Sequence, residues 1–467
     1  MARTVSWEHA VVLGGGYAGL LAARVTADHF RQVTIVERDL LGDEPHRPGT
    51  PQAHHPHGLL ARGAEILEAL FPGLRSQLLG AGCPVTDFGT GTRTLFPSGW
   101  APREALGIDV QLLARTTLEG LLRRRVTALS AVVLRDGTQA DGLIVGRDGQ
   151  TAEVVVRRRG PQSPGKEPER ILADLVIDAT GRGSRLPQWL DLAGLRCPPM
   201  SVVDGRITYA SRLYALDAAP PRDWLASYEP TLAPAAPRGG VVARVGPCHW
   251  LLGLIGAAGN TPPADEAGFR AYAVGLRNPD LAGIIDEGTP LTPIHRTRAT
   301  ANRLHRYHRV DHWPGHVIAL GDSVCALNPV YGQGMTVAAL QAALLSTLLD
   351  RYAETGRPAH LGPAFQQGAA RLVRGPWLLN TSADRAWAAE RAPFASRLAT
   401  GYLTALTARL PHHTDLFLRF ARTMHMLDTP RALVSPHVVA QLSRPTHLGR
   451  AREATRGVHP VPPRSTP

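Results

Sequence analysis

Three glycines near the start of the chain have the spacing of a phosphate-binding turn. They are Gly14, Gly16 and Gly19 in AVVLGGGYAGLLAAR, and Glu37 lies eighteen residues beyond the last of them. Such glycines permit a tight turn, let a pyrophosphate approach backbone N–H groups and let a helix pack on a strand. Glu37 is placed to accept hydrogen bonds from ribose hydroxyls. The pattern predicts a dinucleotide-binding unit at residues 10–40 and disfavours a 2′-phosphate.

Two later stretches carry further glycines and acids. LVIDATGRGS places Asp178 at the end of an apolar run, and VIALGDSVCALNPVYGQGM contains Gly321, Asp322, Pro329, Gly332 and Gly334. A carboxylate there can hold a hydroxyl of a ribityl chain. The glycines and the helix start behind them can present N–H groups to a pyrimidine-type carbonyl that gains negative charge on reduction. Since an NAD-binding fold needs no second acid so far along the chain, the combination favours FAD.

The elements that must position these residues follow from the apolar patterning. Short apolar runs predict buried strands at residues 10–13, 32–37, 173–180 and 315–320, with helices at 17–27, 335–352 and from 362 to 442. Residues 108–126 predict a strand and then a helix. Residues 131–156 predict hairpin strands that turn at Asp136-Gly137 and Asp148-Gly149. Alternating patterns at 200–216 and 239–256 indicate a mixed or antiparallel sheet.

This order predicts an α/β fold in which the nucleotide-binding domain is discontinuous. We expect a glutathione-reductase-like FAD-binding Rossmann domain, an inserted β-sheet substrate domain and a C-terminal helical region. The expected boundaries are 1–85, 106–195 and 301–355 for the FAD-binding domain, 86–105 and 196–300 for the substrate domain, and 356–467 for the helical region.

The composition first suggests a nucleic-acid binder, because 51 basic residues outnumber 39 acidic ones and give a formal charge of +12. However, Lys166 is the only lysine, which indicates a bias towards arginine along the whole chain, and we expect no nucleic-acid partner. The four cysteines form no CxxC pair, so we expect free thiols in a cytoplasmic protein rather than disulfides or zinc. No apolar run reaches ~18 residues, so we expect no transmembrane segment.

The three separated motifs resemble those of FAD-dependent monooxygenases of the para-hydroxybenzoate hydroxylase type. The resemblance implies that Glu37 binds the adenosine ribose and that Asp322 binds the ribityl chain. It places Pro329, Gly332 and Gly334 against the isoalloxazine. It also implies that Arg115, in LLARTTLEGLL, lies near the ribose and pyrophosphate. The remaining candidate cofactor contacts, in or beside the matching motifs, are Arg38, Arg47, Asp178 and Met335.

Two stretches resemble a narrower group. RPGTPQAHHPHGLLARGAEILEALFPG and DATGRGSRLPQWL are similar to actinobacterial flavin-dependent epoxidases of polyether antibiotic biosynthesis, which are relatives of squalene epoxidases. This resemblance implies epoxidation of a linear polyene or polyketide through a C4a-hydroperoxyflavin, with O₂ and with electrons from NADPH, NADH or a partner flavin reductase. We expect no catalytic side chain, because alkene epoxidation needs no protein nucleophile or base. The expected substrate wall is 200–256, with helices after residue 362 as a lid.

Several alternatives remain open. One is an FAD-dependent aromatic hydroxylase of a polyketide, which often uses a base to deprotonate a phenol. A flavin halogenase is disfavoured, since that family relays the halogen through a lysine and Lys166 falls in the polar loop 157–170. An isoprenoid reductase would work without O₂, and a flavoprotein scaffold would show no reductant-dependent O₂ consumption.

A few other residues attract attention. His54, His55 and His57 suggest a metal site, but no carboxylate or cysteine stands at ligand spacing, so we expect no metal and a loop near the flavin. Tyr331 follows Pro329 and could face the flavin or simply pack. Asp384, with its neighbours Arg385 and Trp387, is expected on a solvated helix face.

Overall fold

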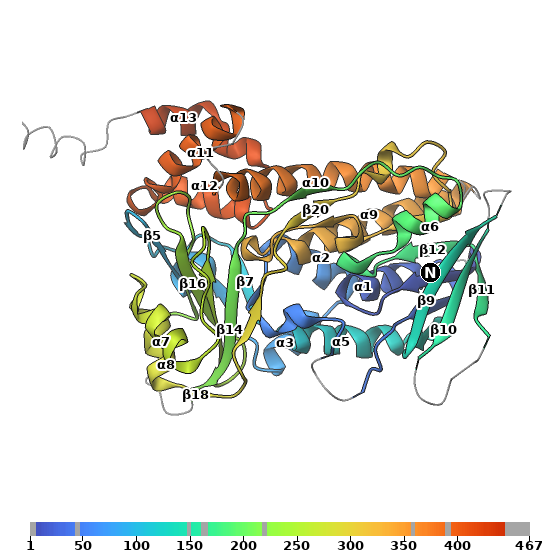
Figure 1. Cartoon of the computed structure of the whole chain (residues 1–467), viewed down its shortest axis with the longest axis horizontal. Helices are drawn as coiled ribbons and strands as arrows, with labels where there is room; N and C mark the ends of the chain where they lie inside the picture. Colours follow the sequence, from blue (N-terminus) through green and yellow to red (C-terminus); the bar gives the residue numbers. More distant parts are fainter. Residues whose placement is uncertain are drawn as a thin grey trace, which may run out of the picture.

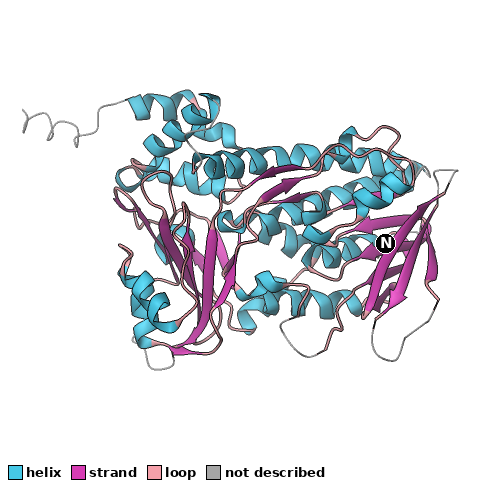
Figure 2. Cartoon of the chain, viewed as in Figure 1, coloured by secondary structure: helices cyan, strands magenta, loops and turns pink. Residues whose placement is uncertain are grey.

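The computed structural model of the chain describes residues 6–42, 47–146, 151–159, 167–216, 222–355, 360–387 and 394–443. Helices and strands form two β-rich ends joined by long helices (Figures 1 and 2). Within the described part, no helix combines the length and apolar character needed to cross a membrane.

A five-stranded parallel sheet lies at the centre of the nucleotide-binding side. Its order is β21 (Val317–Ala319), β12 (Leu175–Asp178), β1 (Trp7–Leu13), β2 (Phe30–Val36) and β8 (Val132–Arg135). The inner strands are short and apolar because both faces are covered. Segments far apart in the sequence therefore end at one edge of one sheet.

Helices cover one face of this sheet and a smaller sheet covers the other. The helical layer consists of α1 (Tyr17–Thr26), α2 (Ala61–Leu70), α3 (Leu74–Gly80), α5 (Arg115–Thr127) and α9 (Gly334–Thr355). The opposite layer contains α6 (Leu186–Leu192) and the antiparallel strands β9 (Thr138–Val145), β10 (Ala152–Arg158) and β11 (Glu169–Ala173).

The expected hairpin at Asp136-Gly137 is wrong. Strand β8 pairs in parallel with β2, whereas β9 pairs with β10, so this turn connects two different sheets. Gly137 adopts φ +55° there, which suits glycine. The second expected turn, Asp148-Gly149, lies outside the described residues, as does Lys166.

The second β-rich end is an eight-stranded mixed sheet. It contains β5 (Thr92–Phe96), β6 (Gly99–Trp100), β14 (Thr208–Ala215), β15 (Ala226–Glu229), β16 (Arg238–Arg244), β17 (His249–Gly256), β18 (Thr289–Pro290) and β19 (His295–Thr297). Helices α7 (Glu266–Val274) and α8 (Pro279–Glu287) pack on one face of it around Phe269 and Leu281. The opposite face is left to form the wall of a chamber.

Short strands connect the two ends. Strands β3 (His57–Leu59), β7 (Asp109–Leu113) and β4 (Val85–Asp87), followed by α4 (Phe88–Gly91), form one small sheet region, and β13 (Ser201–Val203), β20 (Asn302–Leu304) and β22 (Cys325–Ala326) form another. Helix α10 (Leu361–Ala386) runs from the parallel sheet towards the mixed sheet, where α11 (Phe394–Thr407), α12 (Thr414–Met424) and α13 (Pro436–Ser443) gather (Figure 1). This is the predicted α/β architecture with an inserted sheet and a helical C-terminal region.

Candidate functional site

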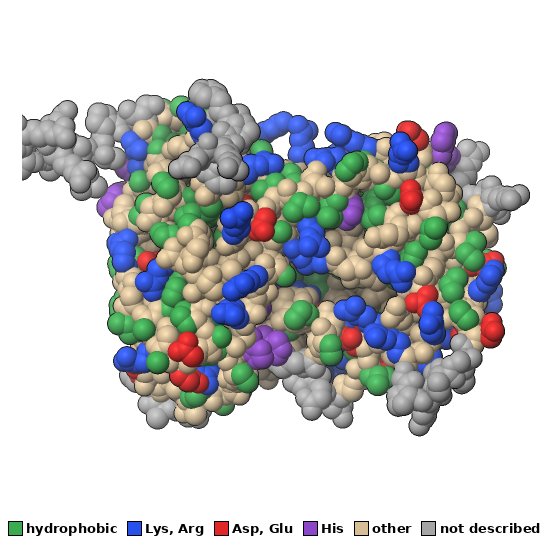
Figure 3. All heavy atoms as spheres, viewed as in Figure 1, with side chains coloured by type: hydrophobic (Ala, Val, Ile, Leu, Met, Phe, Trp, Pro, Cys, Tyr) green, Lys and Arg blue, Asp and Glu red, His purple; other side chains and the backbone are tan. Residues whose placement is uncertain are grey.

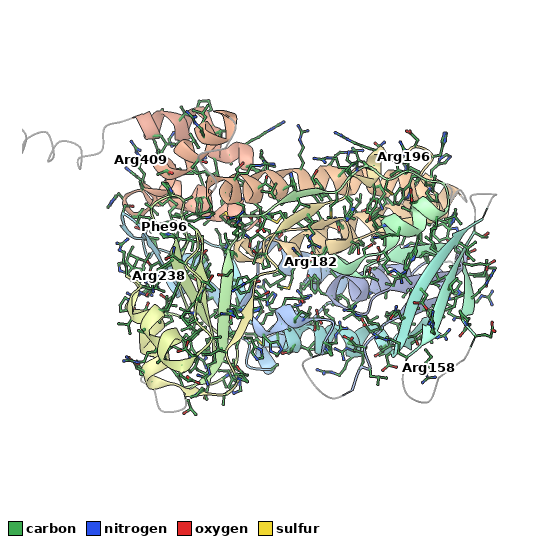
Figure 4. All side chains as sticks on the ribbon, in the orientation of Figure 1. Phe96, Arg158, Arg182, Arg196, Arg238 and Arg409 are labelled. Carbon is green, nitrogen blue, oxygen red and sulfur yellow. The ribbon has the colours of Figure 1, made fainter. Side chains whose placement is uncertain are left out.

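A cavity of about 490 Å³ lies at the carboxyl edge of the parallel sheet. It is lined by most of the residues singled out in the sequence: Gly14, Gly16, Glu37, Arg38, Arg47, Arg115, Gly321, Asp322, Pro329, Gly332, Gly334 and Met335. The face of the molecule in Figure 3 is hollowed at its centre, with basic side chains around the hollow. Figure 4 places Arg182, another lining residue, between the two β-rich ends.

The N-terminus of α1 opens into this cavity. Gly16 is its N-cap and has no side chain to cap the helix, no acidic residue lies in the first turn, and Tyr17 N donates to Glu119 Oε1 at 3.3 Å. Gly14 has φ +95°, and a Cβ there would approach the Ala179 carbonyl oxygen to 2.7 Å. A Cβ on Gly19 would meet the Gly14 oxygen at 1.8 Å, so Gly19 serves helix–strand packing and does not line the cavity. The backbone N–H groups at this helix start and the helix dipole suit a diphosphate.

Glu37 and Arg47 form a buried pair in the same wall. The Glu37 carboxylate accepts hydrogen bonds from Gly15 N at 2.7 Å and Asp39 N at 2.9 Å, and it lies 2.9 Å from an Arg47 guanidinium nitrogen. Burial lowers the pKa of Arg47, but Glu37, Glu119 and Asp39 together raise it above its usual value. Among the described residues, Arg47 Nε is buried without a hydrogen-bond partner. Because both residues line the cavity, the pair can still bind a ribose or a phosphate.

Arg115 adds a second cation near the α1 N-terminus. As the first residue of α5, it donates from Nε to Glu119 at 2.8 Å, and its guanidinium lies 5.7 Å from the centre of the Tyr17 ring. Glu119 also lies 3.7 Å from Arg47. Because one buried carboxylate holds both arginines, two cations are kept beside the helix terminus, where phosphates would lie.

Asp322 also lines this cavity. It follows β21 and Gly321, whose φ of +71° bends the chain away from the strand. Burial raises the pKa of Asp322, while Arg182 and Arg115 oppose that rise. A Cβ on Gly334, the first residue of α9, would lie 4.0 Å from its Oδ1. This carboxylate can accept polyol hydroxyls, and the α9 start can face an electron-rich carbonyl.

Asp178 does not line the cavity. Its carboxylate is fully buried and accepts hydrogen bonds from Thr180 N at 3.0 Å and from the Ser184 hydroxyl. Burial raises its pKa, and these hydrogen bonds oppose that rise. The structure therefore places Asp178 behind the wall, where it supports the turn that carries Thr180 and Arg182 to the surface of the cavity.

A second cavity of about 220 Å³, which we name the apolar chamber, adjoins the first. Both cavities share Pro56, His57, Gly58, Pro329 and Gly332. The chamber's other lining residues are His55, Leu60, Phe88, Thr92, Val110, Leu112, Tyr209, Ser211, Ala226, Tyr228, Val241, Ala243, Gly253, Ile255, Val330, Tyr331 and His425. None of them is Asp, Glu, Lys or Arg. Beyond residue 362, only His425 contributes to the chamber among the described residues, so the C-terminal helices supply little of its lining.

The three histidines that line the chamber, His55, His57 and His425, are held neutral. Burial lowers the pKa of His55 and of His57 to about 3 each, and that of His425 to about 4. His55 Nδ1 lies 2.9 Å from the Ser211 hydroxyl, and His57 Nδ1 donates to the His55 carbonyl at 2.8 Å. Among the described residues, no group of three or more His, Cys, Asp or Glu side chains is placed to hold a metal ion. These imidazoles shape an uncharged wall.

Asp384 is where the sequence-based interpretation is wrong. Instead of lying on a solvated face, it is 1% exposed and accepts hydrogen bonds from Tyr331, Asn302 and Asn328. A signal was present, because Asp384 continues the helical spacing of the buried positions Ala369, Val373, Pro376 and Asn380 along α10. Its neighbour Trp387 packs against the chamber wall.

No family model matches the chain, but four curated relatives do, and three of them are described here. Protein Rv3254 of Mycobacterium tuberculosis is 31% identical over 81% of this chain and 80% of its own. Kynurenine 3-monooxygenase of Salinispora tropica is 25% identical over 96% of this chain and 99% of its own. The FAD-dependent monooxygenase cctM of Talaromyces islandicus is 28% identical over 38% of this chain and 47% of its own.

Solved structures share the fold at low sequence identity. A flavoprotein/dehydrogenase from Cytophaga hutchinsonii has a TM-score of 0.65 at 14% identity, over 96% of this chain and 99% of that one. The flavin-dependent brominase Bmp2 has a TM-score of 0.64 at 14% identity, with the same coverage. The chain thus belongs to the family of protein Rv3254 and is a distant homologue of FAD-dependent monooxygenases.

Proposed function

We propose that this chain is an FAD-dependent monooxygenase that epoxidises an alkene of a linear, apolar polyene, as in the assembly of a polyether natural product. The observation that carries the proposal is the apolar chamber, which adjoins the cofactor cavity and whose lining, in the part of the chain that the structure describes, contains no Asp, Glu, Lys or Arg. Oxygen transfer to an alkene requires a bound, oriented double bond and the exclusion of water, and an uncharged wall serves both needs.

The cofactor cavity supports FAD as the bound group. The α1 terminus with Arg47 and Arg115 would hold the diphosphate, Glu37 the adenosine ribose, and Asp322 the ribityl chain. FAD, when bound, supplies the activation of O₂. The pieces 1–85, 106–195 and 301–355 would form its domain. In each turnover, one alkene and one O₂ would react with two protons and with two electrons from NADPH, NADH or a flavin reductase. The products would be one epoxide and one water.

Hydroxylation of an aromatic ring is the second candidate. The relative named kynurenine 3-monooxygenase favours it, and so do the rings of Phe88, Tyr209 and Tyr228 in the chamber. Burial raises the pKa of Tyr228 to about 12 and also raises that of Tyr209, so neither phenol would serve as a base near neutral pH. The aromatic substrate that would fit this wall best is an uncharged ring that can be hydroxylated without first losing a proton.

One experiment separates the two. FAD-loaded protein is incubated with NADPH or NADH, or with a flavin reductase, under ¹⁸O₂, with linear polyenes in one set and uncharged aromatics in the other. Mass spectrometry should find a single ¹⁸O in an epoxide formed from a polyene. Labelled phenols with unchanged polyenes would replace the proposal by hydroxylation, and brominated or chlorinated products in the presence of halide would replace it by halogenation.

A further inference from the structure

We propose that Asp384 is a positioning residue for this oxygen transfer, acting through Tyr331 and Asn328 on the turn between the cofactor cavity and the apolar chamber. The inference rests on the proposed function, because it concerns the same site. The turn is residues 328–332, and its members Pro329 and Gly332 line both cavities. A residue that sets this turn therefore sets the distance between bound cofactor and substrate.

The contacts of Asp384 reach the turn from two sides. Its Oδ1 accepts a hydrogen bond from the Tyr331 hydroxyl at 2.8 Å, and its Oδ2 accepts one from Asn302 Nδ2 at 2.6 Å. Asn328 Nδ2 lies 3.1 and 3.0 Å from the two oxygens. The side chain of Asn328 in turn accepts from Val330 N at 3.2 Å. The Asp384 carboxylate is thus one hydrogen bond away from Asn328 and Tyr331 and two hydrogen bonds away from Val330.

Tyr331, Asn302 and Asn328 all donate hydrogen bonds to the Asp384 carboxylate. Because Tyr331 donates its only proton to Asp384, its oxygen can only accept hydrogen bonds from anything in the chamber. An asparagine at position 384 would place an N–H₂ group where one carboxylate oxygen now accepts, either opposite Tyr331 or opposite Asn302. Tyr331 would then lose its acceptor, or Asn302 would lose its acceptor, and a buried unpaired group costs about 1–3 kcal/mol.

The charged surroundings of Asp384 are sparse. The groups facing it are Tyr331 from the turn, Asn328 beside it, Asn302 of β20 and Asp204 from the loop before β14. Burial raises the pKa of Asp384 to about 6, the three hydrogen-bond donors lower it and Asp204 raises it. A Cβ on Gly205 would lie 2.8 Å from Asp384 Cγ, so the loop leaves no space for a larger side chain.

The test compares Asp384→Asn with Asp280→Asn. Asp280 is the control, because its carboxylate, 11% exposed, also accepts hydrogen bonds from two side chains, Ser227 at 2.6 Å and Arg93 at 3.0 Å, and lines neither cavity. The visible absorption of bound FAD is recorded from pH 5 to 8. Wild type and Asp280→Asn should show a spectral transition near pH 6 that Asp384→Asn lacks. The same transition in Asp384→Asn would overturn the inference.

A double-mutant cycle then tests the route through Tyr331. With the substrate identified above, Asp384→Asn should lower kcat about tenfold with KM nearly unchanged and release more H₂O₂ per NADPH. The loss should be much smaller when Tyr331 is already phenylalanine, and additive losses would overturn the route. Should Asp384→Asn not fold, a Tyr331→Phe variant with an unaltered FAD spectrum and coupling would overturn it. A wild-type protein that binds no FAD would instead overturn the proposed function, and this inference with it.

Discussion

The cofactor cavity and the apolar chamber share a wall but are built from opposite kinds of residue. The cavity holds Glu37, Arg47, Arg115 and Asp322, each in or beside a recognisable motif. The described residues that line the chamber include no Asp, Glu, Lys or Arg, and they come mostly from strands and loops between positions 55 and 425. The difference teaches that a few local turns are enough to form a site for a charged ligand. An uncharged chamber, in contrast, needs segments from the whole fold to be packed together.

The largest expected effect comes from breaking this contrast with a charge in the chamber. Val241 lies on the chamber face of β16, while its neighbour Val242 packs beneath α8. Val241→Asp should keep FAD, measured at 450 nm, but lower the turnover of an apolar substrate about 100-fold, because an ionised carboxylate retains water and a buried charge costs several kcal/mol.

The control for this change is Val241→Thr, which keeps the shape and adds no charge. It should retain turnover within about fivefold, in keeping with a cost near 1 kcal/mol for a partly satisfied hydroxyl. Equal turnover in Val241→Asp and the wild type would show that the chamber does not receive the substrate.

The next effect is on stability and follows from the neutral histidines. His55 and His57 have a pKa of about 3 in the folded protein and His425 about 4, against about 6.5 when unfolded. The unfolded chain therefore binds more protons between these values, and the free energy of unfolding should fall as the pH drops from about 6.5 towards 4. Asp384 works in the opposite direction, since its raised pKa costs stability as the pH rises from about 4 to 6.

Urea unfolding at several pH values separates these contributions. Between pH 6.5 and 4, His425→Gln should reduce the loss in the free energy of unfolding by about 3 kcal/mol. The reason is that glutamine does not titrate, whereas the pKa of His425 is about 4 when folded and about 6.5 when unfolded. His249→Gln, at an exposed position, is the control and should leave the slope unchanged. An identical slope in both variants would mean that His425 titrates normally in the folded protein.

The cavity was predictable because its chemistry is local. Gly14 and Gly19 are each required by close backbone approaches within one turn, and the apolar runs around them predict the strands that bring Asp322 to the same edge. Asp178 shows the limit, because a strand-end acid has the same pattern whether it faces the cavity or supports the turn behind it.

The chamber and the Asp384 contacts were not predictable from local patterns. Asp384 lies 53 residues from Tyr331 and 82 from Asn302, so only tertiary packing brings these groups together. The hairpin error has the same origin, since β8 found a better parallel partner in β2 than in its neighbour along the chain. Pairing between distant segments overrides the turn preference of Asp136-Gly137.

In the cofactor cavity, Asp322→Ala should have a smaller effect, on the affinity for FAD. Loss of a hydrogen bond to a charged group costs about 1.5–3 kcal/mol, which corresponds to FAD binding about 10–100 times more weakly. Equilibrium dialysis or the quenching of flavin fluorescence measures this change. Asp280→Asn, at a residue that lines neither cavity, is the control, and equal FAD affinity in both variants would remove Asp322 from the site.

The smallest expected effect distinguishes two arginines of the same wall. Arg38 has a side chain that is 58% exposed and lies 3.9 Å from Asp39, whereas Arg47 is 8% exposed and pairs with Glu37 at 2.9 Å. An exposed cation is screened by water and salt, so Arg38→Ala should weaken FAD binding by no more than about fivefold, and added salt should remove the difference. Arg47→Ala leaves the buried Glu37 unpaired and should weaken FAD binding more, with little response to salt. If the two variants lost affinity equally, exposure would not govern how this wall holds the phosphates, and the cavity would depend on its net charge rather than on its buried pairs.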